Sequence, residues 1–441
     1  MKLPFNLERH TATSKVAVIA FLVLVLLIPV SMIKNIILDR SQIESVATRD
    51  IRNLWGGDQT IAGPILRLPY EVLKTTVYGS PYSESKHAYL LAEKLHIVAT
   101  VDTEIRYRGI HEVPVFAATI DMVGNFDLSL LDTLGIGRDD VNWSGAVVLL
   151  GVSDATAIKT TPILEMAGTS SKFKTGVAQI AGLPPQLGAD IGDRMIDAAT
   201  KADLPIRISV AVNGSGTLKF LPLANSAEVR MSTNWASPGF VGRQLPAERN
   251  IRETGFDATW LVSGLSRNLP AIWTDADKTK TTAVENAFGV RLIQPVGLYQ
   301  LMTRAIKYAV LFVGLTFVIY FLMEIVSNLR LHPLQYLLVG LANALFYLLL
   351  LSLAEHVGFG PAYIVSASAS AALITGYSVT ILTSRRRAMV LAAALFGLYV
   401  FLYLTLKAQN YALVAGSTGL WFVLAAVMYL TRKINWYATD D

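Results

Sequence analysis

An acid and an imidazole stand side by side where a long apolar stretch ends: Glu355 and His356 follow the residues 334–354. A carboxylate next to an imidazole can exchange protons near neutral pH, because histidine titrates there. The pair can also mark the point where a helix leaves a membrane, because a charge costs about 3 kcal/mol at the bilayer centre and almost nothing at the interface. Both interpretations stay open: a polar pocket that faces the outer side, or a helix boundary.

Two further polar residues interrupt apolar stretches. Glu324 lies near the inner end of the stretch 308–326, where it could pair with Arg330 across the following turn. Asn343 lies midway along 334–354, and an amide in hydrocarbon needs a hydrogen-bond partner. We interpret Glu324 as a membrane anchor and Asn343 as a contact between helices.

The sequence carries no signature of a common catalytic or metal centre. It has no cysteine, no phosphate-binding glycine loop and no G-x-S-x-G nucleophile turn. His111-Glu112 is followed by Pro114, which would break the helix that a zinc motif requires, and the six histidines do not cluster at metal-ligand spacing. We therefore predict no catalytic residues, no cofactor and no metal, hence no enzyme. A membrane-embedded hydrolase is the weakest alternative.

The composition indicates which kind of molecule positions these residues. Of 441 residues, 53% are hydrophobic and only 16% are charged, whereas a soluble domain has about 25% charged residues. The deficit falls on 16–33 and 305–431, while 34–304 has an ordinary composition. The net charge of +5 does not indicate nucleic acid as a partner, because much of the basic excess lies at the ends of apolar stretches. We predict an integral membrane protein with one large water-exposed insert.

Six apolar stretches have the roughly 20 residues that cross a bilayer. They cover 16–33, 308–326, 334–354, 362–383, 388–406 and 412–430. No small-residue cleavage site follows the first stretch, so we interpret it as an uncleaved anchor rather than a signal peptide. The last five form a bundle over 305–431.

Basic residues orient these spans. Arg330, the run Arg385 to Arg387, and the pair Arg432 and Lys433 follow alternate spans, while the other loops of the bundle hold only Lys407. Clustered lysine and arginine stay in the cytoplasm. We predict a cytoplasmic N-terminus at 1–15, a cytoplasmic tail at 432–441, and an insert at 34–304 in the periplasm of a bacterium.

We expect an α+β membrane protein, in which the membrane spans are helices and the exported insert is rich in strands. Residues 34–54 carry a loose apolar stripe and predict a helical stalk that continues the anchor. Beyond it, β-branched and aromatic segments favour a sandwich-like β domain. Hairpin or turn signals stand at 108–109, 124–125 and 213–214, a strand is expected at 143–153, and 182–205 reads as helix or loop.

Four stretches together resemble the CreD family of bacterial inner-membrane proteins, which are also called cell-envelope integrity proteins. They are "WGGDQTIAGPILRLPY" (55–70), "SPGFVGRQLPAERNIRETGFDATW" (237–260), the stretch 288–325, and "HPLQYLLVGLANALFYLLLLSLAEHVGFGPAY" (332–363). In the first, Trp55, Gln59, Gly63 and Pro64 form a candidate junction motif just after the stalk. The fourth stretch contains Glu355 and His356, and it departs from the family pattern at Asn343, where an aliphatic residue is expected.

The resemblance implies one anchor, a large periplasmic domain and a C-terminal helical bundle. It also implies a role in envelope integrity and in the response to envelope stress, including colicin tolerance and a sensor-kinase regulon tied to β-lactams. It supplies no functional residues to carry over. We expect a non-enzymatic protein whose periplasmic domain binds or senses an envelope component, with the lipid bilayer, envelope components or other inner-membrane proteins as partners. The alternative is a transporter or lipid-handling protein that uses Glu355 and His356 at the outer mouth.

Overall fold

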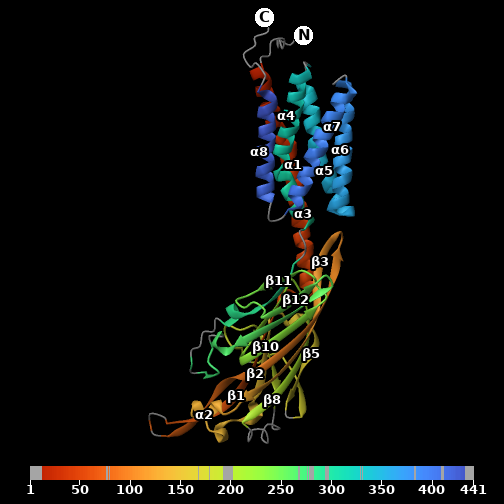
Figure 1. The fold of residues 1–441 in the computed structure, drawn as a ribbon. Helices are drawn as coiled ribbons and strands as arrows, with labels where there is room; N and C mark the ends of the chain where they lie inside the picture. Colours follow the sequence, from red (N-terminus) through yellow and green to blue (C-terminus); the bar gives the residue numbers. More distant parts are fainter. Residues whose placement is uncertain are drawn as a thin grey trace. The chain divides into compact units, whose positions relative to one another are not determined.

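The structure is a computed structural model, and it describes most of the chain. The described residues are 12–75, 78, 80–166, 168–177, 179–191, 202–266, 269–275, 277, 283–293, 297–327, 329, 331–381, 384–408 and 412–432. They divide into two compact units (Figure 1). The helical unit comprises 1–45 and 296–441, and the sheet unit comprises 46–295.

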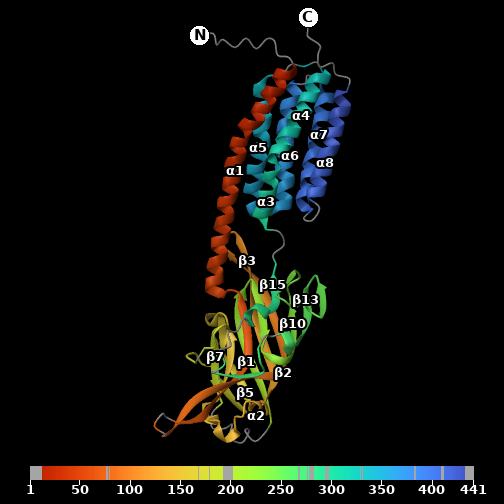
Figure 2. The ribbon, with the colours of Figure 1, turned by 90° about the vertical axis from the view of Figure 1, so that its left-hand side faces the viewer.

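The helical unit is a bundle of long apolar helices that run side by side (Figure 2). Its helices are α1 (Ala12–Trp55, whose last turns belong to the sheet unit), α3 (Leu298–Lys307), α4 (Ala309–Ser327), α5 (Pro333–Val357), α6 (Phe359–Ile381), α7 (Arg385–Lys407) and α8 (Ala412–Thr431). Two buried clusters form its core, one around Phe346 and Tyr347 and one around Phe317 and Tyr320. The helical segment predicted at 34–54 is part of α1.

The structure supports four to five of the six membrane spans that the sequence predicts. Among the described residues, four helices are long and apolar enough to cross a bilayer: α1, α5, α6 and α7. A fifth crossing results if α3 and α4, whose axes differ by 45° at a break, count as one span. The predicted span 412–430 forms α8, but its apolar part, Gly416–Tyr429, is shorter than the roughly 20 residues of a full crossing.

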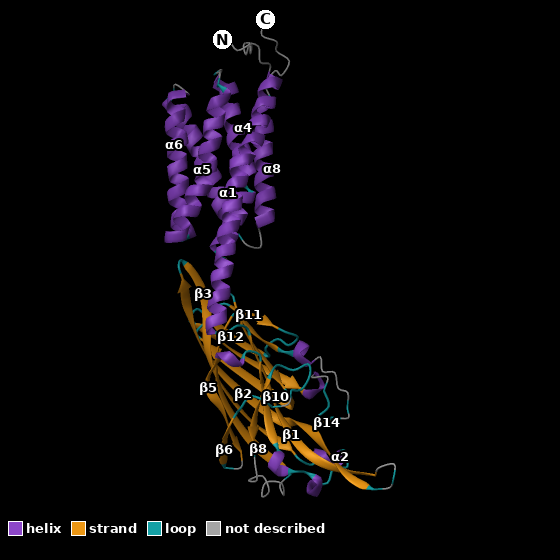
Figure 3. Ribbon diagram, turned by 180° about the vertical axis from the view of Figure 1, so that it is seen from behind, coloured by secondary structure: helices purple, strands orange, loops and turns teal. Residues whose placement is uncertain are grey.

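The described residues of the sheet unit form 15 strands, which confirms the β-rich insert. Figure 3 shows these strands as the main secondary structure of the unit. The strands are β1 (Gln59–Thr75), β2 (Pro81–Arg108), β3 (His111–Asp127), β4 (Val147–Val152), β5 (Ile158–Met166), β6 (Thr169–Lys172), β7 (Gln186–Asp190), β8 (Asp203–Ser215), β9 (Thr217–Pro222), β10 (Ala224–Thr233), β11 (Pro238–Val241), β12 (Glu248–Arg252), β13 (Gly255–Ser263), β14 (Ile272–Thr274) and β15 (Phe288–Leu292). A short helix, α2 (Leu130–Thr133), follows β3.

The strand β2 connects two sheets. Its first half pairs with β1 and β14, and its second half pairs with β3 and β10. The strand order along the main path is β11-β15-β9-β1-β2-β3-β8-β5-β6. One large cluster of buried side chains draws on both halves, with Phe116, Phe220 and Trp260 among its largest members. The sheet unit therefore has a hydrophobic core of its own.

Two of the predicted turns are wrong, for the same physical reason. Residues 124–125 lie within β3 and residues 213–214 lie within β8, and both pairs are in register with neighbouring strands. A Cβ on Gly214 would collide with the Phe116 ring, and a Cβ on Gly124 would collide with the Lys94 carbonyl oxygen. These glycines allow close packing between strands, whereas the expected turn at 108–109 does join β2 to β3.

Two further segments differ from the sequence expectation. Residues 186–190, expected as helix or loop, form the strand β7, which pairs with β4. The amphipathic helix α3 was not predicted, although its buried residues Tyr299, Met302, Ala305 and Ile306 follow helical spacing. The polar residues Gln300, Thr303 and Arg304 lie between them and obscure the apolar pattern in the sequence.

Candidate functional site

The pair Glu355 and His356 lies on the last turn of α5, and the structure separates the two side chains. Glu355 is 10% exposed, whereas His356 is exposed and makes no described contact. Successive residues of a helix point about 100° apart, so one faces the bundle and the other faces away. The two residues therefore do not form one site.

Three helices meet at the Glu355 carboxylate. The Tyr299 hydroxyl of α3 donates a hydrogen bond to Glu355 Oε1 at 2.9 Å, and Arg40 Nε of α1 lies 3.7 Å from the same oxygen. Arg40 is 49% exposed, so water screens much of its charge. The buried tyrosine, which is 4% exposed, is the more firmly placed partner. This cluster is polar and internally paired at the point where α5 ends.

The local sequence explains why α5 ends there. Gly358 has φ +78°, a left-handed conformation that favours glycine, and its N–H donates to the Ala354 carbonyl at 3.1 Å. It is the single residue between α5 and α6. The reversal places Glu355 at the rim of the bundle, which is consistent with a helix boundary as well as with a polar pocket.

A second group of polar side chains lies deeper, between α5, α6 and α7. Asn343 is fully buried, and its Oδ1 is 3.5 Å from the Tyr399 hydroxyl. Among the described residues, no partner is found for Asn343 Nδ2, the Tyr347 hydroxyl or the Ser366 hydroxyl, all of them buried. An unpaired polar group in a protein interior costs roughly 1–3 kcal/mol. Asn343 thus has only a long contact between helices.

Glu324 on α4 is paired at the other end of the bundle. Its carboxylate accepts hydrogen bonds from the Lys15 ammonium at 2.7 Å and the Tyr336 hydroxyl at 2.8 Å. The Leu331 N–H donates at 3.1 Å. Arg330, the partner that the sequence suggested, lies outside the described residues. Glu324 is 4% exposed, so these three donors compensate for its burial.

The junction residue Trp55 ends α1 within the sheet unit. Its indole N–H donates to the Phe116 carbonyl at 3.1 Å, and the Arg106 guanidinium lies 4.4 Å from its ring centroid. Trp55 also packs against Ile51 of α1 and against Val113 and Val115 of β3. The Phe116 carbonyl thus contacts the polar edge of the Trp55 ring and Arg106 covers one face. These contacts indicate a packing role for Trp55.

The other junction residues shape the start of β1. Gln59 is fully buried, and its side-chain amide donates to the Asn213 carbonyl at 3.1 Å. Gly63 has φ +112°, and Gly63 and Pro64 are joined by a cis peptide bond where the pairing of β1 with β4 shifts register. These contacts hold β1, β4 and β8 together.

The sheet unit carries a polar cluster that sequence reasoning missed. Asp275, just after β14, accepts hydrogen bonds from the His87 N–H at 2.9 Å and from the Tyr89 hydroxyl at 2.9 Å. His87 Nδ1 lies 2.8 Å from the same carboxylate. Burial alone would raise the pKa of Asp275, but the hydrogen bonds from His87 and Tyr89 outweigh it and hold the pKa below its usual value.

Arg67 completes this cluster. In the sheet register, Arg67 of β1 lies opposite Tyr89 of β2, which lies opposite Trp273 of β14. The Tyr89 and Trp273 rings stack with centroids 5.4 Å apart. Burial, and then the bond to Asp275, raises the pKa of Tyr89 to about 12. Arg67 Nε is buried and finds no partner among the described residues. Donors, an acceptor and aromatic rings thus share one face.

The sequence offered only a faint signal for this cluster. His87 and Tyr89 are two residues apart on one strand and so share a face. Asp275 is 188 residues further along the chain, and only the pairing of β14 with β2 brings it there. Among the described residues, no group of three or more histidine, aspartate or glutamate side chains could hold a metal ion.

The chain is similar to known proteins over nearly its whole length. The family described as "Inner membrane protein CreD" matches residues 11–437. The inner membrane protein CreD of Escherichia coli (strain K12) is 32% identical over 422 residues, which cover 94% of this chain and 92% of that protein. Among solved structures, an M1 zinc metallopeptidase from Deinococcus radiodurans is 10% identical, with 38% of each chain covered and a TM-score of 0.19. A substrate-bound mutant of that peptidase gives a TM-score of 0.17. Likenesses this low carry no argument.

Proposed function

Because this chain belongs to the family of the inner membrane protein CreD, we propose that it supports cell-envelope integrity and envelope stress tolerance as a non-enzymatic protein. The sheet unit binds an envelope component, and the helical unit serves as its platform in the membrane. The distribution of basic residues supports cytoplasmic termini and a periplasmic location for 34–304. It also supports α8 as a sixth crossing, because Arg432 follows its apolar part.

The observation that carries this proposal is the cluster around Asp275. Arg67 Nε is buried without a described partner, and a half-buried guanidinium is stable where an oxygen acceptor reaches it. His87 and Asp275 are 35% and 42% exposed, so a ligand can reach them from solution. A site with one unpaired donor, one paired carboxylate and stacked rings suits binding of a polar ligand.

A complementation assay tests the proposal. The gene is deleted, and sensitivity to detergent and β-lactam is scored after restoring the full-length wild type, Arg67→Gln or Asp275→Asn at matched expression. We expect both variants to fail to restore resistance. Arg207→Gln is the matched control, because Arg207 is an exposed arginine of the same unit with only a 4.0 Å ion pair.

The same assay includes Glu355→Gln, His356→Ala, and residues 1–304 alone, so that function can be assigned to one unit. Rescue by 1–304 supports a function in the sheet unit. Failure of Glu355→Gln with normal folding, together with full activity of both sheet-unit variants, would disprove the proposal and assign the function to the bundle.

Transport remains the second candidate, because one observation favours it. Glu355 at the end of α5 and the unpaired buried groups of Asn343, Tyr347 and Ser366 are polar positions inside an apolar bundle. Such positions are common along solute pathways. Uptake of a solute panel into proteoliposomes, driven by a proton gradient and lost in Glu355→Gln, would support transport. No uptake by the wild type across the panel would exclude it for those solutes.

A further inference from the structure

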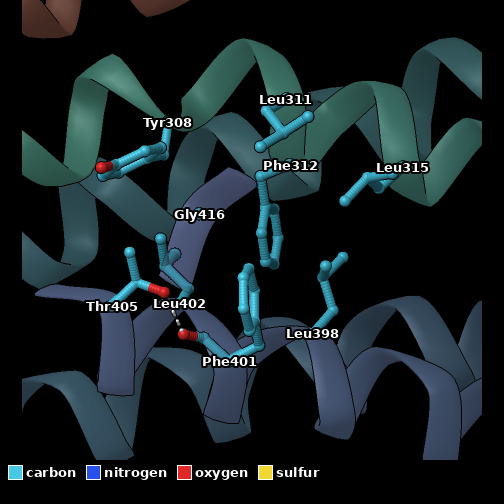
Figure 4. Close-up of a pocket in the computed structure, with 9 residues that line it drawn as sticks. All are labelled: Tyr308, Leu311, Phe312, Leu315, Leu398, Phe401, Leu402, Thr405 and Gly416. Carbon is cyan, nitrogen blue, oxygen red and sulfur yellow. Dashed lines mark hydrogen bonds between the residues drawn. The ribbon is translucent and has the colours of Figure 1, made fainter. Parts of the chain in front are cut away.

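An apolar groove runs along the helical unit between α4, α7 and α8. Figure 4 shows Tyr308 at one end and Leu315 at the other, with Leu398 and Thr405 of α7 facing them and Gly416 of α8 nearby. The Thr405 hydroxyl donates to the Phe401 carbonyl at 2.9 Å, so it is not free for a ligand. The walls of the groove thus offer hydrocarbon and almost no hydrogen-bonding group.

The shape of the groove suits a hydrocarbon chain. Tyr308 and Leu315 are seven residues apart, so the groove extends about 10 Å along α4 at 1.5 Å per residue. The groove is open along one side, and its apolar walls do not suit water, which needs two or more polar partners. Because α4 and α7 are apolar helices of a membrane protein, the chain available to fill the groove is a lipid acyl chain.

A cation stands at the Tyr308 end. Arg304 lies four residues before Tyr308, in the last turn of α3. The axis bends by 45° between α3 and α4 at this point. Arg304 Nη1 is buried and has no partner among the described residues. Lys307, on the same turn, is exposed.

An unpaired buried guanidinium nitrogen requires an acceptor. A phosphate presents oxygens to an arginine in a two-pronged geometry, and such charge-assisted bonds are about twice as strong as neutral ones. Arg304 and Lys307 lie at the end of α3, before the apolar helix α4 begins. A phosphate at that level with an acyl chain below it is the arrangement of a glycerophospholipid.

We propose that the helical unit binds one glycerophospholipid, with an acyl chain in the groove between α4, α7 and α8 and the phosphate on Arg304 and Lys307. The site is distinct from the Glu355 cluster and does not depend on the function proposed for the sheet unit. This site would hold one lipid specifically, in contrast to the surrounding lipids, which exchange freely along the surface of the bundle.

The test uses the full-length protein purified in detergent and stripped of lipid. Native mass spectrometry counts the lipids bound after titration with a short-chain phosphatidylglycerol or with the diacylglycerol that has the same chains. We expect one phosphatidylglycerol per protein at saturation and at least tenfold weaker binding of the diacylglycerol, which lacks the phosphate. Arg304→Gln is expected to weaken phosphatidylglycerol binding about tenfold and to leave diacylglycerol binding unchanged.

Filling the groove tests the acyl-chain position separately. A Cβ on Gly416 would meet only Tyr308 Cε1, at 4.0 Å, so Gly416→Leu can enter the groove without a backbone clash. We expect Gly416→Leu to abolish binding of both lipids, and Leu398→Phe, a second narrowing variant, to weaken both. Far-UV circular dichroism and the thermal midpoint of each variant verify that it folds.

Matched controls use the same changes elsewhere in the helical unit. Gly314→Leu adds the same side chain to α4 at a position with open space around it, and Arg385→Gln removes one exposed positive charge from the first turn of α7. Both are expected to bind like the wild type. Equal binding of the two lipids by the wild type overturns the phosphate assignment. Wild-type binding by folded Gly416→Leu and Leu398→Phe overturns the groove.

Discussion

Two carboxylates of this protein, the largely buried Glu355 and the exposed Asp275, are held by groups that the local sequence does not reveal. Glu355 and Asp275 each accept a tyrosine hydroxyl, and each has a second, more exposed partner. A buried carboxylate without donors would be unstable, so the loss of a single donor should be measurable. This makes the neighbours of the two acids, rather than the acids alone, the residues to change.

Tyr299→Phe should destabilise the helical unit by about 1–3 kcal/mol, because it leaves the Glu355 carboxylate buried with only an exposed arginine nearby. Glu355→Gln should cost less, since an amide oxygen still accepts the tyrosine bond. Unfolding of the full-length protein in mixed micelles measures both. His356→Ala is the neighbouring control, and we expect a change within about 0.5 kcal/mol. A larger loss in His356→Ala than in Tyr299→Phe would contradict this assignment.

Asp275→Asn should lower the stability of the sheet unit in a pH-dependent manner. The pKa of Asp275 is lower in the folded protein than the unfolded value of about 3.9. The ionised carboxylate therefore stabilises the fold above that value, and the stabilisation is lost as pH falls through the folded pKa. Hydrogen exchange of residues 87–91 should show faster opening in the variant at neutral pH. The difference should shrink below about pH 4, and a difference that grows on acidification would refute the assignment.

The sequence identified single candidate residues only where a charged side chain stands next to an apolar stretch. Glu355 and His356 attracted attention because charges are rare next to an apolar stretch, yet the sequence could not tell which side chain faces the bundle. Asp275 is one of many acids in the insert, and only tertiary pairing places it beside His87 and Tyr89. A site assembled from distant strands has no local signature.

At the scale of elements, the link between α5 and α6 is a single glycine. Gly358→Ala should destabilise the helical unit by about 1 kcal/mol, because φ +78° strains a residue that has a Cβ while no neighbouring atom blocks the new methyl group. Gly376→Ala within α6 is the control, since space is also open there and the helix gains propensity. Thermal unfolding of both variants measures the difference, and equal effects would rule out backbone strain at Gly358.

Helices were predicted more closely than strands, for a physical reason. An apolar stretch long enough to cross a membrane is a strong signal, and five of the six predicted stretches match α4–α8 within three residues at each end. Strand ends depend on glycines whose role the sequence leaves open. The glycines at 124 and 214 suggested turns, but the structure uses them where neighbouring groups approach too closely for a Cβ.

At the scale of the whole molecule, each unit has its own buried clusters. Phe116 belongs to the core of the sheet unit and Leu350 to that of the helical unit, and both are fully buried. Phe116→Ala should cost the sheet unit about 3–5 kcal/mol, and Leu350→Ala should cost the helical unit about 2–5 kcal/mol. Hydrogen exchange resolved by segment measures the two units separately. Equal destabilisation of both units by either variant would contradict separate cores.

The overall class of the molecule was therefore predictable from the sequence, while the pairing of its strands was not. Composition alone divides the chain into membrane and water-exposed parts, because the two solvents demand different surfaces. The parallel pairing of β1 with β9 and of β2 with β10 joins segments more than 100 residues apart, and no periodicity encodes such pairing. The cluster around Asp275 also depends on the pairing of distant strands, because β14 pairs with β2.

The order of strands also determines when, during translation, each strand can pair with its neighbours. The strand β1 is made first, and β9 pairs with it in parallel. The other edge of β9 pairs with β15, whose last residue, Leu292, lies just before the bundle. The roughly 230 residues from Gln59 to Leu292 take about 10–50 s to synthesise at ~5–20 residues per second. For most of that interval β1 and β2 lack at least one of their later partners, β9, β10 and β14. A chaperone that shields β1 and β2 until translation reaches α3 would raise the yield of this protein more than one that acts after release.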